Sequence, residues 1–317
     1  SAERNNSRFT TAPMIIDQPL PSDLVAETVV VPTTATVGGM ATFAWTVRNA
    51  GIETVSGHWE DAIYLSRDAV WDLGDSLIGR AEAGAPIVVG GQIVGYSELT
   101  LAPGASYTKQ FTARVPVALP GNYRVILRSD VFDDVPETNN VNNRSASTNS
   151  LDLTVVTLSL NTAMDDSLGA GESRLYRVRV PAEESLEITL TSDDPTAQNE
   201  LYARFEDLPS SLAYDAAYKG HTTANQRIVV PRTNDGYYYI LARGQAGQTN
   251  AHLRARLLPF GVDNVTPDRG GDSRYVTMTL SGARFSPDAV VKLVRPQIDE
   301  REPVSYEVVA VSYTHLT

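Results

Sequence analysis

Short segments in which apolar and polar residues alternate follow one another along most of the chain. Glycine, proline, asparagine and aspartate, the residues that form turns, separate these segments. The clearest segments are residues 42–47, 107–115, 123–127, 175–180, 186–190, 237–241 and 275–280. A period of two places successive side chains on opposite faces of a strand, and helical periodicity is scarce. The pattern predicts an all-β protein of tandem β-sandwich domains.

Two changes of pattern divide the chain into predicted domains. The alternation changes near Thr157 and again near Phe260, which predicts one β-sandwich over residues 22–156 and another over residues 157–259. A length of 317 residues suits about two or three domains. A sandwich of this kind needs about 80–100 residues, so we expect residues 260–317 to form only part of a third domain.

Both ends of the chain differ from the strand pattern. Residues 1–21 are polar and end in Pro19-Leu20-Pro21, which is typical of a linker between domains. The chain begins without the charged and apolar regions of a signal peptide, so we expect it to be an internal piece of a longer protein. Residues 311–317 do not continue the strand pattern and resemble the translation of a DNA-sequencing adapter. We therefore assign no function to this doubtful tail.

The first predicted domain carries several characteristic motifs. They are FAWTVRNAG at 43–51, the acidic loop SRDAVWDLGD at 66–75, LAPGASY at 101–107, PGNYRV at 120–125 and VPETNNVNN at 135–143. Together they resemble the bacterial cell-adhesion-related domain (CARDB), an immunoglobulin-like β-sandwich that occurs in strings on large secreted proteins. The resemblance implies an architectural or binding role.

The remaining segments resemble two other extracellular modules. Residues 171–181 (GESRLYRVRVP), 199–205 (NELYARF) and 236–242 (GYYYILA) resemble the bacterial pre-peptidase C-terminal (PPC) domain, a jelly-roll-like β-sandwich. That resemblance implies assistance with secretion or substrate binding, without chemistry of its own. Residues 262–271 and 276–285 resemble the opening strands of an immunoglobulin-like, plexin and transcription-factor (IPT/TIG) domain.

Composition excludes several classes of partner. The formal net charge of −12 would repel phosphate backbones, so nucleic acid is excluded. The chain has no cysteine, and therefore neither disulfides nor a thiolate metal site. The sequence contains no run of 18 apolar residues, the length that a membrane-spanning helix needs. We expect a secreted or cell-surface location.

Calcium is the one cofactor with support in the sequence. Asp68, Asp72 and Asp75 lie in one loop, and calcium prefers six to eight oxygen ligands. Additional ligands could come from elsewhere in the same domain if the loops meet; these are Asp61, Glu137, Asp133, Asn139 and Asn140. The alternative is that these short side chains form turns by accepting hydrogen bonds from their own backbone.

Catalytic patterns are absent from the sequence. The four histidines are His58, His221, His252 and His315, and none lies in a recognisable triad or metal motif. The glycine-x-serine-x-glycine, histidine-glutamate-x-x-histidine and phosphate-loop patterns are also missing. We therefore expect no enzymatic activity in this chain.

Aromatic side chains are the candidates for a ligand surface. One candidate group is Trp59, Trp71, Tyr64 and Tyr96, and another is Tyr237, Tyr238 and Tyr239 with Tyr214 and Tyr218. The alternative is that Trp45 fills the core and the tyrosines pack across strands. Alternation predicts that Tyr237 and Tyr239 share one sheet face while Tyr238 points to the other.

These observations favour a non-catalytic, multidomain segment of a large secreted or surface-attached bacterial protein. Its role would be spacing and adhesion, with glycan or protein binding and calcium-stabilised loops. The alternative is an accessory region of a secreted peptidase whose catalytic domain lies outside this chain.

Overall fold

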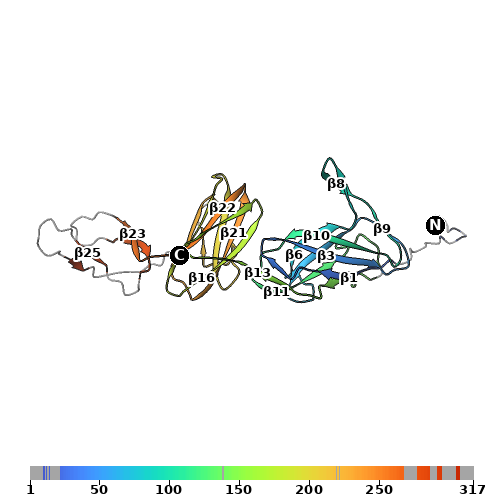
Figure 1. Cartoon of the computed structure of the whole chain (residues 1–317), viewed down its shortest axis with the longest axis horizontal. Helices are drawn as coiled ribbons and strands as arrows, with labels where there is room; N and C mark the ends of the chain where they lie inside the picture. Colours follow the sequence, from blue (N-terminus) through green and yellow to red (C-terminus); the bar gives the residue numbers. More distant parts are fainter. Residues whose placement is uncertain are drawn as a thin grey trace, which may run out of the picture. The chain divides into compact units, whose positions relative to one another are not determined.

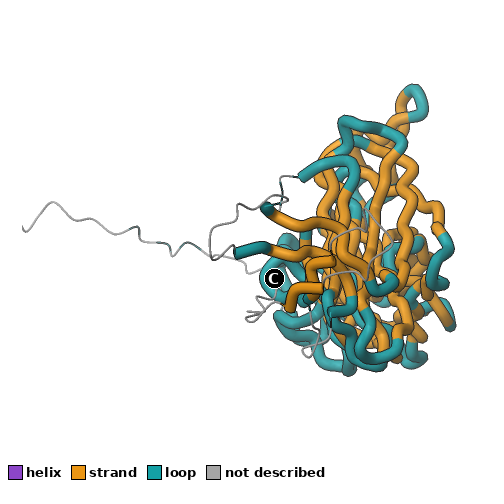
Figure 2. Tube along the Cα trace, turned by 90° about the vertical axis from the view of Figure 1, so that its left-hand side faces the viewer, coloured by secondary structure: helices purple, strands orange, loops and turns teal. Residues whose placement is uncertain are grey.

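The computed structural model describes residues 22–137, 139–218, 220, 222–267, 277–285, 291–294 and 305–307, together with Thr10, Ala12 and Met14. Within these residues the regular structure is entirely β, as Figure 2 shows. The predicted all-β fold class is therefore confirmed. No helix in the described part could cross a membrane. Two compact units make up the chain, the first mostly within residues 1–152 and the second mostly within 153–317.

The first unit is built on two facing sheets. One sheet has the order β1-β3-β10, formed by β1 (Leu24–Val30), β3 (Met40–Asn49) and β10 (Ser106–Arg114). The other has the order β2-β13-β11-β5-β6, formed by β2 (Thr34–Thr36), β13 (Leu151–Thr154), β11 (Gly121–Arg128), β5 (Glu60–Ser66) and β6 (Ser76–Glu82). A short strand, β12 (Arg144–Ala146), also pairs with β11.

Alternation along these strands produces the core of the first sandwich. Phe43, Trp45 and Val47 on β3 are fully buried, as the period-two pattern predicts. Full burial stabilises each such apolar side chain by about 1.5–3 kcal/mol. The ring of Phe111 on β10 lies so close to Gly79 on β6 that a Cβ at this glycine would be 2.6 Å from the ring. Close packing between the two sheets therefore requires glycine at position 79.

Two small ribbons complete the first unit. β4 (Val55–Gly57) pairs with β9 (Leu99–Leu101), and β7 (Pro86–Val89) pairs with β8 (Gln92–Tyr96). The β7–β8 ribbon projects from the body of the sandwich as a hairpin (Figure 1). All four residues of β7 are exposed to solvent.

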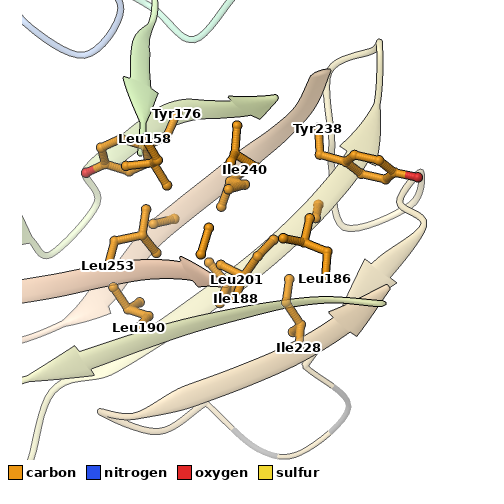
Figure 3. Packing of buried hydrophobic residues seen from close by; sticks show 14 of the residues in the cluster. Leu158, Tyr176, Leu186, Ile188, Leu190, Leu201, Ile228, Tyr238, Ile240 and Leu253 are labelled. Carbon is orange, nitrogen blue, oxygen red and sulfur yellow. The ribbon is translucent and has the colours of Figure 1, made fainter. Parts of the chain in front are cut away.

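The second unit contains another sandwich of two sheets. One has the order β14-β16-β21-β18-β19, formed by β14 (Val156–Leu158), β16 (Ser173–Val180), β21 (Gly236–Ala246), β18 (Gln198–Phe205) and β19 (Ala216–Ala217). The other has the order β15-β22-β17-β20, formed by β15 (Ala163–Gly169), β22 (Gln248–Leu258), β17 (Ser185–Ser192) and β20 (Gln226–Val230). Leu186, Ile188 and Leu190 on β17 face Tyr238 and Ile240 on β21 across the core (Figure 3).

Short strand pairs follow the second sandwich. β23 (Gly261–Thr266) pairs with β24 (Thr279–Ala283), and β25 (Lys292–Val294) pairs with β26 (Ser305–Glu307). The doubtful tail at 311–317 lies outside the described residues, as does most of the predicted linker at 1–21. β14 begins at Val156, one residue before the predicted start of the second domain. The boundaries 22–156, 157–259 and 260–317 stay predictions.

Candidate functional site

The carboxylates of the acidic loop fold back on their own backbone. Asp68 Oδ1 accepts a hydrogen bond from the Val70 amide at 2.7 Å. Asp72 Oδ1 accepts one from Gly74 at 2.6 Å, and Asp75 Oδ2 accepts one from the Asp72 amide at 2.9 Å. This is the turn-forming alternative that the sequence left open.

Asp61 lies in the interior of the first sandwich, where it accepts four hydrogen bonds. The donors are Trp45 Nε1 at 2.6 Å, Tyr107 Oη at 2.7 Å, Ser129 Oγ at 2.8 Å and the Asp130 amide at 3.3 Å. Burial raises the pKa of Asp61, and these donors oppose the rise. Trp45 and Tyr107 belong to the facing sheet, so the Asp61 carboxylate holds the two sheets together by hydrogen bonds.

Glu137 anchors the start of β1. Its Oε2 accepts a hydrogen bond from the Leu24 amide at 2.5 Å, and its Oε1 accepts one from Asn143 Nδ2 at 2.8 Å. Burial raises the pKa of Glu137 to about 7, and the nearby carboxylates of Asp130 and Asp23 add to the rise.

The remaining candidate calcium ligands are also engaged locally. Asn140 Nδ2 donates to Asp133 Oδ1, and Asn139 Oδ1 accepts from the Val141 amide at 3.2 Å. Across the described ranges, no group of three or more histidine, aspartate or glutamate side chains could hold a metal ion. As they are placed, the predicted carboxylates do not form a calcium site, and calcium binding stays a prediction.

Trp71, which lies in the acidic loop, makes aromatic and cation–π contacts with the neighbouring sheet. Its indole packs edge-on against the Tyr64 ring, with 5.9 Å between ring centroids. The guanidinium carbons of Arg128 and Arg144 lie 4.1 Å and 5.1 Å from the centroid of the Trp71 ring, within the range of cation–π attraction. Trp71 Nε1 is buried and has no hydrogen-bond partner among the residues that the structure describes.

Strand register places three arginines in one row on the outer face of this sheet. Arg144 on β12 lies opposite Arg128 on β11, Arg128 lies opposite Ala62 on β5, and Ala62 lies opposite Arg80 on β6. The neighbouring residues Ile63 and Leu127 point into the core, so the row faces outward. We call Arg80, Arg128 and Arg144 the arginine row.

Phe132 and Tyr64 extend the aromatic part of this surface. The guanidinium carbon of Arg80 lies 5.0 Å from the centroid of the Phe132 ring, and Phe132 is 54% exposed. Tyr64 lies on β5, two residues from Ala62, and therefore on the same face. The sequence placed Tyr64 and Trp71 in one candidate platform with Trp59 and Tyr96, and of these the structure pairs Tyr64 with Trp71. It missed the arginines, whose shared row depends on the pairing of four strands.

The other predicted aromatic platforms are divided between core and surface. Trp59 is 1% exposed and donates through Nε1 to Tyr107 Oη at 3.1 Å, so it belongs to the core and not to a ligand surface. Tyr96 lies on the projecting hairpin. No described contact brings these two residues to Trp71.

In the second sandwich, the tyrosine run also contributes mainly to packing. Tyr238 is 1% exposed in the core, and Tyr239 is buried on the opposite face. Tyr237 is half-buried beneath Arg177, whose guanidinium carbon lies 4.6 Å from the ring centroid. Tyr214 packs against Tyr202. The predicted alternation is confirmed: Tyr214 is exposed and Tyr237 is half-buried, and Tyr218 is half-buried against the core.

Two further features of the second sandwich have potential chemistry. His252 is bonded through Nδ1 to Asp165 at 2.7 Å and through Nε2 to Asp193 at 2.9 Å, and these hydrogen bonds raise the pKa of His252. A cavity of about 80 Å³ is lined by Asn199, Glu200, Leu201, Tyr202, Tyr218, Gly220, Thr222 and Gln226. Sites for small molecules are typically about 300–1,000 Å³, so this cavity suits water.

Comparison with known proteins supports the expectation for the first domain. The CARDB family model matches residues 21–147. A search of curated proteins finds no match. The predicted IPT/TIG resemblance at the C-terminal end stays a prediction.

Several solved structures are similar to parts of the chain. The CARDB domain of a Pyrococcus furiosus protein, solved in complex with di-metal ions, is 17% identical, with a TM-score of 0.28, and covers 43% of this chain and 97% of that domain. The pre-peptidase C-terminal domain of collagenase from Bacillus anthracis is 19% identical, with a TM-score of 0.25, covering 32% and 94%. The secreted serine protease VesC from Vibrio cholerae is 13% identical, with a TM-score of 0.26, covering 76% and 51%.

Proposed function

We propose that this chain is a non-catalytic spacing and ligand-binding segment of a larger secreted or surface-attached bacterial protein. The CARDB match over residues 21–147 supports a modular, extracellular role. The single observation that favours binding is the arginine row, where Arg128 and Arg144 stack on Trp71 at an outward sheet face. The ligand would be an extracellular glycan or protein held on that face.

An accessory role beside a secreted peptidase is the second candidate. It is supported by the resemblance of residues 171–181 and 236–242 to the pre-peptidase C-terminal domain. In this case the second sandwich would assist secretion or hold the substrate of a catalytic domain elsewhere. The sequence adjoining this chain in its gene would separate the two roles, because a protease motif there supports the second one.

An array of purified polysaccharides and extracellular proteins tests the first proposal. We expect the intact chain to bind at least one component and to leave every component uncleaved. Release of new reducing ends or of peptide fragments would contradict the non-catalytic role. Binding that survives replacement of both Arg128 and Arg144 would remove the observation on which the binding role rests.

A further inference from the structure

The arginine row contains a like-charge pair that the described protein does not neutralise. Arg128 and Arg144 lie directly opposite each other in an antiparallel pair. Like charges in this arrangement destabilise a sheet. Within the described residues, neither guanidinium has a carboxylate partner or a hydrogen-bond acceptor, although other arginines of this acidic chain do, as Arg48 does with Glu27. The pair therefore costs stability in the free protein.

Trp71, the ring on which both guanidinium groups stack, itself carries a buried donor without an acceptor among the described residues. An unsatisfied buried donor of this kind destabilises the free protein. Two guanidinium groups thus stack on one indole ring and lack any acceptor among the described residues. An anion with several oxygens would complement both guanidinium groups.

The shape of the surface favours an extended ligand. Four adjacent strands carry the row from Arg144 to Arg80, and a strand spacing of about 4.8 Å gives it a length of about 14 Å. Phe132, beside Arg80, offers an exposed ring that can pack against the apolar face of a sugar. In the next row, Glu60 lies opposite Glu82 and would repel an anion, which confines the ligand to the arginines.

We propose that the arginine row binds the carboxylates of an acidic polysaccharide. Arginine forks match planar carboxylates with two parallel hydrogen bonds each. The chain carries a net charge of −12, so a polyanion would be repelled from most of its surface and retained at this row. The exposed aromatic ring favours a sugar polymer over an acidic peptide. This inference rests on the proposed non-catalytic binding function and specifies its ligand.

Isothermal titration calorimetry of the intact chain with polygalacturonate tests this inference. We expect binding to polygalacturonate, at least tenfold weaker binding to neutral galactan, and at least tenfold weaker binding to polyglutamate. We also expect a chain with both Arg128→Gln and Arg144→Gln to lose at least tenfold in affinity. A control chain with Arg48→Gln and Arg179→Gln has the same change in charge at exposed, paired arginines and should change affinity less than twofold.

A melting curve of each variant without polymer separates binding from folding. Because the substitutions remove a repulsive pair, the Arg128→Gln, Arg144→Gln chain should melt no lower than the parent. Equal binding of parent and double variant would overturn the inference, as would equal binding of galactan or polyglutamate. Shortening of the polymer during incubation would instead overturn the non-catalytic function, so the two failures are distinguishable.

Discussion

At the scale of single residues, Asp61 shows how a carboxylate can be a structural centre. Its two oxygens accept hydrogen bonds from Trp45, Tyr107 and Ser129, which come from different strands or loops of the first sandwich. Replacement by alanine would leave these buried donors without an acceptor. We expect Asp61→Ala to lower the free energy of unfolding by about 3 kcal/mol or more.

Urea denaturation followed by tryptophan fluorescence measures this effect. Asp72→Ala is the matched control, since Asp72 is an exposed carboxylate whose hydrogen bond to Gly74 only closes a turn. Its cost should stay within about 1 kcal/mol. Equal costs for the two substitutions would show that the Asp61 network contributes little.

Glu137 gives the first sandwich a defined pH dependence. Burial raises its pKa from 4.5 to about 7, so the folded state holds this proton more tightly than the unfolded state does. The stabilisation from the proton is complete below about pH 4.5 and is lost as the pH rises through 7. We expect Glu137→Gln, which keeps an acceptor for Leu24 and carries no charge, to flatten the fall in stability over this range.

Thermal midpoints of the parent and Glu137→Gln chains between pH 4.5 and pH 8 check this expectation. Glu183→Gln is the control, because Glu183 is an exposed carboxylate in a surface pair with Arg232. Parallel curves for the parent and Glu137→Gln would contradict the assigned pKa. Asp61 and Asp130 also have raised pKa values, so the test is the difference between variants and not the slope of one curve.

The sequence predicted some residue roles and missed others for a physical reason. The alternative in which Trp45 fills the core is the one that the structure shows, and Trp45 Nε1 bonds the Asp61 carboxylate there. Neither that bond nor the arginine row follows from spacing along the chain, because each requires knowing which strands pair and in what register. Asp61 was therefore predicted as a calcium ligand, although it lies in the interior.

At the scale of elements, the β7–β8 hairpin combines strong strand-forming sequence with exposure. Residues 86–96 contain no charged side chain, and Ile87, Val88, Val89, Ile93 and Val94 are all exposed. Such an apolar run is typical of a buried strand, so sequence alone could not indicate that it projects from the sandwich. Packing around the element decides its burial.

Substitutions in this hairpin should have little effect on stability. We expect a chain with Val88→Lys and Val94→Lys to melt within about 4 °C of the parent, because exposed substitutions usually change stability by no more than about 0.5 kcal/mol each. Val125→Ala is the contrast, since Val125 is fully buried on β11. Differential scanning calorimetry makes the comparison. A large loss from the lysine variants would show that the hairpin is covered.

The acidic loop tests the calcium hypothesis at the same scale. Calcium would have to draw Asp68, Asp72 and Asp75 away from the turn bonds that they make. The hypothesis predicts that millimolar calcium raises the midpoint of the first transition by several degrees over chelator, and that Asp72→Ala abolishes the rise. Magnesium at equal ionic strength is the control. An unchanged midpoint would assign these carboxylates to turn formation alone.

At the scale of the whole molecule, each sandwich has its own core and its own pair of sheets. Residues 42–47 and 186–190, picked out by alternation, lie in β3 and β17, so the sequence predicted where the main strands form. It could not predict that β14 pairs in parallel with β16, which joins residues about twenty positions apart. Local pattern specifies a strand, whereas its neighbour in the sheet depends on the packed domain.

Independent cores lead to a prediction about folding. Val155 alone separates β13 of the first sandwich from β14 of the second. We expect fragments 22–155 and 156–285 each to unfold cooperatively, and the midpoint of each to agree with one transition of the intact chain. The second fragment extends to residue 285 because Arg284 contacts the second sandwich, bonding Glu184 Oε1 at 3.2 Å. Calorimetry of the three chains would decide. Failure of either fragment to fold while the intact chain folds would show that the sandwiches depend on each other.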